Sequence, residues 1–171
     1  MDVISHGLWG GIAFGRKNPK NYLIAFFIGL APDVFSFGIF MIARLLGFSK
    51  MDFSGGHTDP SLIPQYVHIL YNFTHSLIIF FVIFFLVWLI LKKPYWLLGA
   101  WGLHILIDIP THSFAFFPTP FLWPVSNFMI NGISWGNPII FFPDVAILII
   151  LYAIFWYKKR ESTHSLIKII N

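Results

Sequence analysis

The chain has 171 residues, of which 57% are hydrophobic, 20% aromatic and 11% charged, and its mean hydropathy is +0.76. A soluble globular domain carries about 25% charged residues, so this composition indicates the membrane class and excludes an ordinary soluble domain. The sequence has no cysteine, which excludes disulfides, thiolate catalysis and cysteine-based zinc sites. We expect one membrane-embedded helical domain over residues 1–171.

Five apolar segments are predicted from run lengths and from the helix breakers between them. In chain order they are Val3–Gly15, Tyr22–Gly47, Phe73–Leu91, Tyr95–Ile109 and Ile139–Tyr157. The second, third and fifth can cross about 30 Å of hydrocarbon at about 1.5 Å per residue. The third could begin as early as Pro64, because proline suits a first helical turn. The fourth is marginal in length. The first is short, so it is expected to be half-inserted, re-entrant or strongly packed. The predicted fold is an all-α polytopic membrane helix bundle.

Glycine repeats every four residues in the first segment, at Gly7, Gly11 and Gly15. This spacing forms two overlapping GxxxG patterns, which allow helix backbones to approach closely in lipid. The pattern predicts that this segment packs tightly into the bundle.

Basic residues divide unequally between the two sides of the membrane if the five segments alternate in direction. Of the 11 Lys and Arg residues, only Arg44 and Lys50 fall on one side. The other side holds Arg16, Lys17, Lys20, Lys92, Lys93, Lys158, Lys159, Arg160 and Lys168. The positive-inside rule therefore places this second group in the cytoplasm, and places the N-terminus and the two long connections outside.

The two long connections comprise residues 48–72 and 110–138. The second contains five prolines together with Trp123 and Trp135. Proline and tryptophan at this density indicate an ordered loop at the membrane interface rather than a solvated linker.

Buried-looking histidines and aspartates all fall near the outer ends of the predicted segments. The topology was derived from Lys and Arg alone, so this common depth is an independent observation. The residues are His6, Asp33, His75, His104, Asp108, His112 and Asp144. An ionisable residue inside a membrane segment is costly, about 2.5–3.5 kcal/mol for Asp, and usually marks a functional interior.

The most specific pattern is "HILIDIPTH", residues 104–112, in which His104, Asp108 and His112 recur every fourth residue. Residues one helical turn apart share a face. Pro110 is expected to end the helix, so that His112 can fold back toward the other two. Imidazole and carboxylate together suit zinc, manganese or iron. Taken singly, His6 could be a packing residue, and Asp33 could pair with a basic residue or cap a helix broken at Pro32.

At these residues the sequence resembles the YdjM-like family of bacterial and archaeal inner-membrane proteins, a family described as membrane-bound metal-dependent hydrolases. The resemblance covers most of the chain. It rests on "SHGLWG", "APD", "THS", and "HILIDIPTH" continuing into "FFPTPFLWP" and "GISWGNP". It implies a prokaryotic protein integral to the cytoplasmic membrane.

The candidate ligands are also similar in type and order to those of the zinc-dependent phospholipase C and P1 nuclease group. Those helical enzymes bind a cluster of zinc ions and cleave phosphodiesters. The resemblance implies metal-binding roles for His6, Asp33, His75, His104 and Asp108. The chain has no counterpart of the group's downstream His and Glu ligands, because the last segment offers only Asp144. One or two ions are therefore expected rather than three.

The resulting hypothesis is a membrane-embedded metal-dependent hydrolase with its site at the extracytoplasmic interface. His6, Asp33, His75, His104 and Asp108 would hold one or two divalent ions, zinc above all. His112 would be a further ligand or would orient one. Asp33 or Asp144 would act as the base. The depth of the site favours a lipid or lipid-linked substrate, and a phosphodiester by analogy.

Two other functions remain open from the sequence. A transporter for metal ions or protons also uses intramembrane His and Asp, but it needs polar groups that reach both faces, and the inner halves of the last four segments show none. A structural membrane protein could use the same residues in contacts between helices. DNA binding is not expected, because no nucleic-acid motif is left once topology accounts for the charges. The sequence does not predict an oligomeric state.

Overall fold

The computed structural model describes residues 1–47 and 63–170, the last ten as backbone only. Lys50 and the rest of residues 48–62 lie outside the described residues, as does the Lys168 side chain. The regular elements in this part of the chain are helices, as predicted. They are α1 (Val3–Phe14), α2 (Pro19–Leu45), α3 (Gln65–Thr74), α4 (Leu77–Leu91), the short 3-10 helix η2 (Trp96–Leu98), α5 (Gly99–Thr111) and α6 (Pro138–Ile170).

Two of these helices are long and apolar enough to cross a membrane, namely α2 and the Pro138–Arg160 part of α6. The pair α3 and α4, bent by 57°, passes the same test if it is counted as one span. The described helices therefore support two or three spans, fewer than the five predicted segments. The difference lies in the two marginal segments. The first forms only the short helix α1, and Tyr95–Ile109 is divided between η2 and α5.

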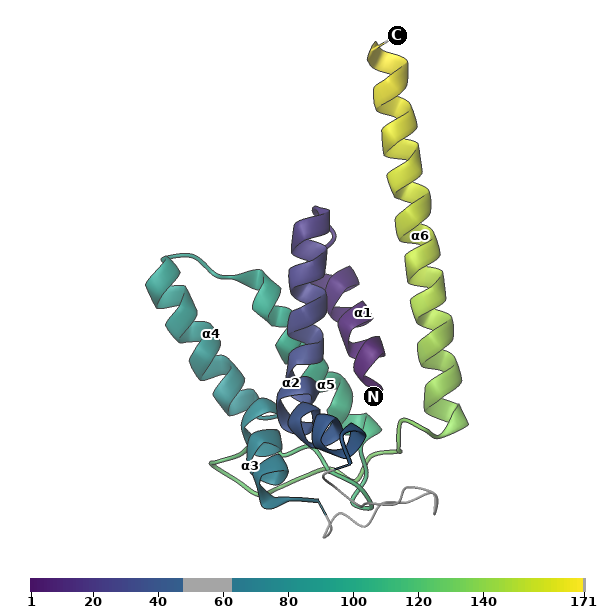
Figure 1. Cartoon of the computed structure of the whole chain (residues 1–171). Helices are drawn as coiled ribbons and strands as arrows, with labels where there is room; N and C mark the ends of the chain where they lie inside the picture. Colours follow the sequence, from purple (N-terminus) through teal and green to yellow (C-terminus); the bar gives the residue numbers. More distant parts are fainter. Residues whose placement is uncertain (48–62, 171) are drawn as a thin grey trace.

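Helices α1, α2 and α5 lie side by side at the centre of the molecule, and α4 and α6 diverge on opposite sides of them (Figure 1). The turn between α1 and α2, the turn after α4 and the C-terminal end of α6 point to the same end of the molecule. This arrangement places the short helices α1 and α5 against a long one. Their polar residues are thereby brought to a shared interior.

Close packing of α1 on α2 depends on glycine, as the GxxxG pattern predicts. Side chains of α2 cover the Gly7 and Gly11 positions of α1, and a Cβ at Gly11 would lie 2.6 Å from the Tyr22 ring. Gly29 of α2 makes the reciprocal approach, because a Cβ there would lie 2.5 Å from the His6 backbone oxygen. Backbone cannot yield as the end of a side chain can, so Gly29 sets the distance between the two helices at a candidate site residue.

The substitution Gly29→Ala is therefore expected to destabilise the protein by about 1–3 kcal/mol, the usual cost of overpacking a close contact. Gly38→Ala is the matched control in the same helix. A Cβ at Gly38 meets only Val34 Cγ1 at 3.4 Å, and alanine generally favours a helix over glycine by about 0.5–1 kcal/mol. Thermal unfolding in detergent measures both variants. Equal midpoints for the two would contradict the assigned role of Gly29.

The bend between α3 and α4 falls at His75 and Ser76, which cap the end of α3 and the start of α4. The Ser76 side chain accepts a hydrogen bond from the Ile79 backbone and donates one to the Trp123 carbonyl. The Leu77 N–H donates to the Phe121 carbonyl at 3.0 Å. The proline- and tryptophan-rich loop thus holds the bend in place.

The later part of this loop is attached to the end of α5 by three backbone hydrogen bonds. The N–H groups of Gly132, Ile133 and Trp135 donate to the carbonyls of His112, Pro110 and Thr111 at 2.8–2.9 Å. The expectation of an ordered loop is therefore confirmed. Helix α5 continues one residue beyond Pro110 before it ends.

Candidate metal centre

Four side chains from three parts of the fold converge on one small volume. Asp33 comes from α2, His75 from the bend between α3 and α4, and His104 and Asp108 from successive turns of α5. One ligand atom from each lies within 4.8 Å of the corresponding atoms of the other three. The candidate residues predicted from separate segments are thus brought together by tertiary packing.

The distances within this four-residue cluster run from 3.0 to 3.8 Å. His104 Nε2 lies 3.1 Å from Asp108 Oδ2, and His75 Nε2 lies 3.5 Å from the same oxygen. Asp33 Oδ1 lies 3.4 Å from His75 Nε2 and 3.8 Å from His104 Nε2. The two Nε2 atoms are 3.0 Å apart.

The tautomers of the two imidazoles follow from their outer contacts. His104 Nδ1 lies 2.8 Å from the Gly29 carbonyl oxygen, which can only accept, so Nδ1 carries the proton. His75 Nδ1 lies 3.2 Å from the Tyr71 carbonyl and 2.9 Å from Thr74 Oγ1, whose own proton goes to the Leu70 carbonyl. His75 Nδ1 is therefore a donor as well.

Each neutral ring consequently directs its Nε2 lone pair into the cluster, where two carboxylate oxygens also point. Four acceptors then face one another without a donor among them. Lone pairs at this separation repel unless a cation lies between them. An Nδ1–H held by a backbone carbonyl is also the usual way that proteins orient a metal-binding histidine.

Burial makes this arrangement costly without a positive partner. His75, His104 and Asp108 have exposed fractions of 0%, 1% and 0%. Asp108 Oδ2 is buried and has no hydrogen-bond partner. A buried carboxylate without compensation is strongly disfavoured. The four residues therefore fit a divalent cation by ligand type, by orientation and by charge.

The other oxygen of Asp108 faces a second group of atoms. His6 Nε2 lies 2.9 Å and His112 Nδ1 3.3 Å from Asp108 Oδ1, and the Met1 amino group lies 2.6 Å from it. The His6 ring stacks on His104 with centroids 3.7 Å apart, and neither of its nitrogens has a hydrogen-bond partner. His6 and His112 thus lie beside the four-residue cluster and share Asp108 with it.

Asp144 lies apart from this arrangement. Its Oδ1 accepts a hydrogen bond of 2.7 Å from Trp9 Nε1. It lines a groove of about 240 Å³ with Met1 and Thr111, beside the Asp108 region. The structure does not group Asp144 with the four clustered residues.

Sequence reasoning did not identify the groups that hold the histidines. The Gly29, Tyr71 and Thr74 contacts fix the ring orientations. The Tyr71 ring also stacks on His75 with centroids 3.8 Å apart. Two of these groups are backbone carbonyls, which leave no mark in a sequence. Only Tyr71, one helical turn before His75, carried a side-chain signal.

Together these features define an integral membrane protein of two or three spans with a buried His/Asp cluster that could hold a metal ion. The sequence model of the YdjM inner membrane protein family matches residues 1–170, so the chain belongs to that family. The protein is therefore integral to the inner membrane. No curated protein and no solved structure matches the chain.

Proposed function

We propose that this protein is a membrane-embedded, metal-dependent hydrolase that acts on a phosphodiester or ester of a lipid-type substrate at the extracytoplasmic interface. The observation that carries the proposal is the convergence of four buried acceptor atoms within 4.8 Å, with both imidazoles oriented from outside. A structural cluster of interhelical contacts would pair donors with acceptors instead.

Asp33, His75, His104 and Asp108 would hold one divalent ion, and zinc best matches this mixture of nitrogen and oxygen ligands. His6 and His112 would hold a second ion through the other oxygen of Asp108. When bound, such ions supply Lewis acidity toward a phosphoryl or ester oxygen and activate water.

The residues of the chain have distinct tasks in this proposal. The carbonyls of Gly29 and Tyr71 hold His104 and His75 by their Nδ1 protons. Asp33 is the clustered residue with the most exposed side chain, 13% against 0% for the other three. We therefore assign the role of general base to Asp33. Asp144 is a weaker candidate, because its carboxylate already accepts the Trp9 hydrogen bond.

A lipid substrate is supported by an apolar groove of about 210 Å³ beside the cluster. The groove is lined by Ile28, Ala31, Pro32, Phe35, Thr74, Leu98 and Trp101. Pro32 and Thr74 directly precede Asp33 and His75 in the chain. An acyl chain in this groove would place the polar end of a lipid near the four-residue cluster.

The proposal is tested by screening the purified, metal-loaded protein in detergent against phospholipids and lipid-linked phosphates, with product release followed by mass spectrometry. Hydrolysis that a chelator abolishes and zinc or manganese restores is the expected result. Metal-loaded protein that cleaves none of these substrates, nor a soluble phosphodiester, would contradict the proposed activity.

The substitution Ala31→Phe is expected to fill the groove and to lower kcat/KM for a long-chain lipid by about tenfold or more. Each buried methylene contributes about 0.8 kcal/mol, and about 1.4 kcal/mol corresponds to tenfold. Turnover of a soluble nitrophenyl phosphodiester should stay unchanged. Ala153→Phe, at an exposed position of α6, is the control. Equal losses on both substrates would show that the groove does not select the lipid.

A further inference from the structure

A second pocket lies between the turn from α1 to α2 and the C-terminal half of α6. It has a volume of about 550 Å³, within the range of small-molecule sites. Its basic lining residues are Arg16, Lys17, Lys158 and Lys159, from two segments that are far apart in the sequence. It lies at the end of the molecule that the positive-inside pattern assigns to the cytoplasm, away from the proposed hydrolase site.

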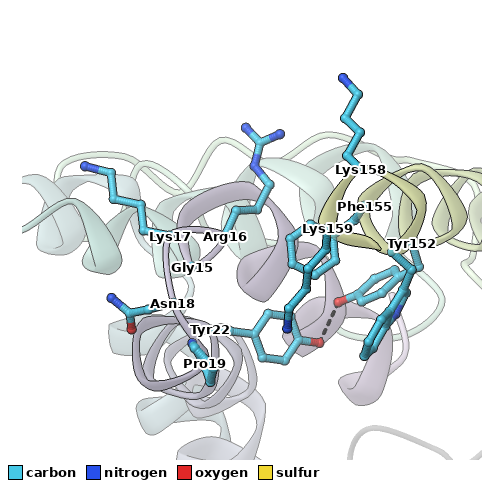
Figure 2. Close-up of a pocket in the computed structure, with 11 residues that line it drawn as sticks. Gly15, Arg16, Lys17, Asn18, Pro19, Tyr22, Tyr152, Phe155, Lys158 and Lys159 are labelled. Carbon is cyan, nitrogen blue, oxygen red and sulfur yellow. Dashed lines mark hydrogen bonds between the residues drawn. The ribbon is translucent and has the colours of Figure 1, made fainter. Parts of the chain in front are cut away.

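The aromatic floor of this pocket is fixed by hydrogen bonds (Figure 2). Tyr152 donates its hydroxyl proton to the Leu8 carbonyl at 2.9 Å, so Tyr22 is the donor in the 2.6 Å contact between the two tyrosines. Both hydroxyl protons are thus already used. A ligand in this pocket would therefore be bound by the cationic side chains and not by the tyrosines.

The charge around the pocket has one sign. Arg16 and Lys158 extend from the rim on the same side, and Lys159 points inward toward Tyr22 (Figure 2). Lys159 also lies over the Trp156 ring, with Nζ 5.4 Å from its centroid. None of the lining residues is acidic. Four cations around an apolar floor are complementary to a phosphate group that carries a hydrophobic tail.

We propose that this pocket binds the headgroup phosphate of an anionic phospholipid of the cytoplasmic leaflet. Basic pockets between membrane helices on the cytoplasmic side are suited to such headgroups. The position also favours a lipid over a free phosphate, because the cations lie at the ends of two membrane-spanning helices, α2 and α6. Bound lipid would bridge α1, α2 and α6 at this end of the protein.

Native mass spectrometry of the detergent-purified protein tests this proposal. The probes are dioleoyl phosphatidylglycerol and dioleoyl phosphatidylcholine, which share acyl chains and differ in headgroup charge. The parent protein is expected to retain phosphatidylglycerol at least about fivefold more strongly. Fivefold corresponds to about 1 kcal/mol, the contribution of one basic residue near an anionic surface. Millimolar inorganic phosphate should not displace the lipid.

The double variant Arg16→Gln, Lys158→Gln is expected to lose this preference, since it removes one cation from each segment. Lys92→Gln, Lys93→Gln is the matched control, because it removes two exposed cations from the turn after α4. A preference that survives in the pocket variant, or that falls equally in the control, would overturn the proposal. Displacement of the lipid by inorganic phosphate would overturn it in favour of a phosphate site.

Discussion

The substitutions His104→Ala and Asp108→Asn are each expected to lower metal-dependent lipid hydrolysis by at least about 1000-fold. That factor corresponds to about 4 kcal/mol, within the several kcal/mol that a catalytic ion contributes to transition-state stabilisation. Asp108 is central, because its two oxygens face the four-residue cluster and the His6 side separately. Initial rates on the lipid substrate measure the effect.

His68→Gln is the control for these variants. His68 is a histidine of α3 that stacks on Phe117 rather than joining the cluster. The rate of this variant should stay within about twofold of the parent rate, since surface or packing changes of this kind alter stability more than chemistry. If His104→Ala kept the parent rate, the assignment of the site would be wrong.

Removal of bound metal is expected to lower the midpoint of thermal unfolding by about 5–10 °C. An ion at about 100 times its dissociation constant stabilises the folded state by about 2.7 kcal/mol, and each kcal/mol shifts the midpoint by about 2–4 °C in a chain of this size. The stabilised element is the junction of α2, α5 and the bend before α4. Unfolding scans with chelator and with added zinc measure the shift.

The variant Asp108→Asn makes this second prediction specific. Its amide can donate a hydrogen bond to an imidazole Nε2, so the metal-free variant should be no less stable than the metal-free parent. Added zinc should not raise its midpoint. A zinc-induced shift of the parent size in this variant would locate the stabilising ion elsewhere.

The core of the candidate site could be predicted from the sequence because it depends on helix geometry and on depth. His104 and Asp108 are one turn apart, and they lie 3.1 Å apart in the structure. Asp33 and His75 were placed at the same depth by counting Lys and Arg, and they join the same cluster. Periodicity and topology together therefore narrow the candidates to a few residues.

What could not be predicted depends on tertiary contacts that leave no local pattern. Asp144 lies near the expected depth, yet its carboxylate is hydrogen-bonded to Trp9 of α1. The rotation of each helix decides which side chains meet, and depth alone contains no information on rotation. The division of contacts between the two Asp108 oxygens has the same origin.

The number of spans shows a related limit. Apolar run length indicates that a segment can be buried, but burial against other helices and burial in lipid give the same composition. Helix α1 is apolar because its glycine face packs on α2. Gly102 of α5 similarly faces the Phe80 ring, where a Cβ would lie 2.8 Å away. Short segments of this kind were counted as crossings from composition alone.

Elemental mass spectrometry of protein purified in detergent without chelator tests the central claim most directly. The proposed metal centre predicts about one to two equivalents of zinc or manganese per chain, lost in His104→Ala and retained in His68→Gln. Protein without metal after reconstitution, or full occupancy in His104→Ala, would contradict it. The facing imidazoles would then be held together by a shared proton, and "HILIDIPTH" would be a packing motif.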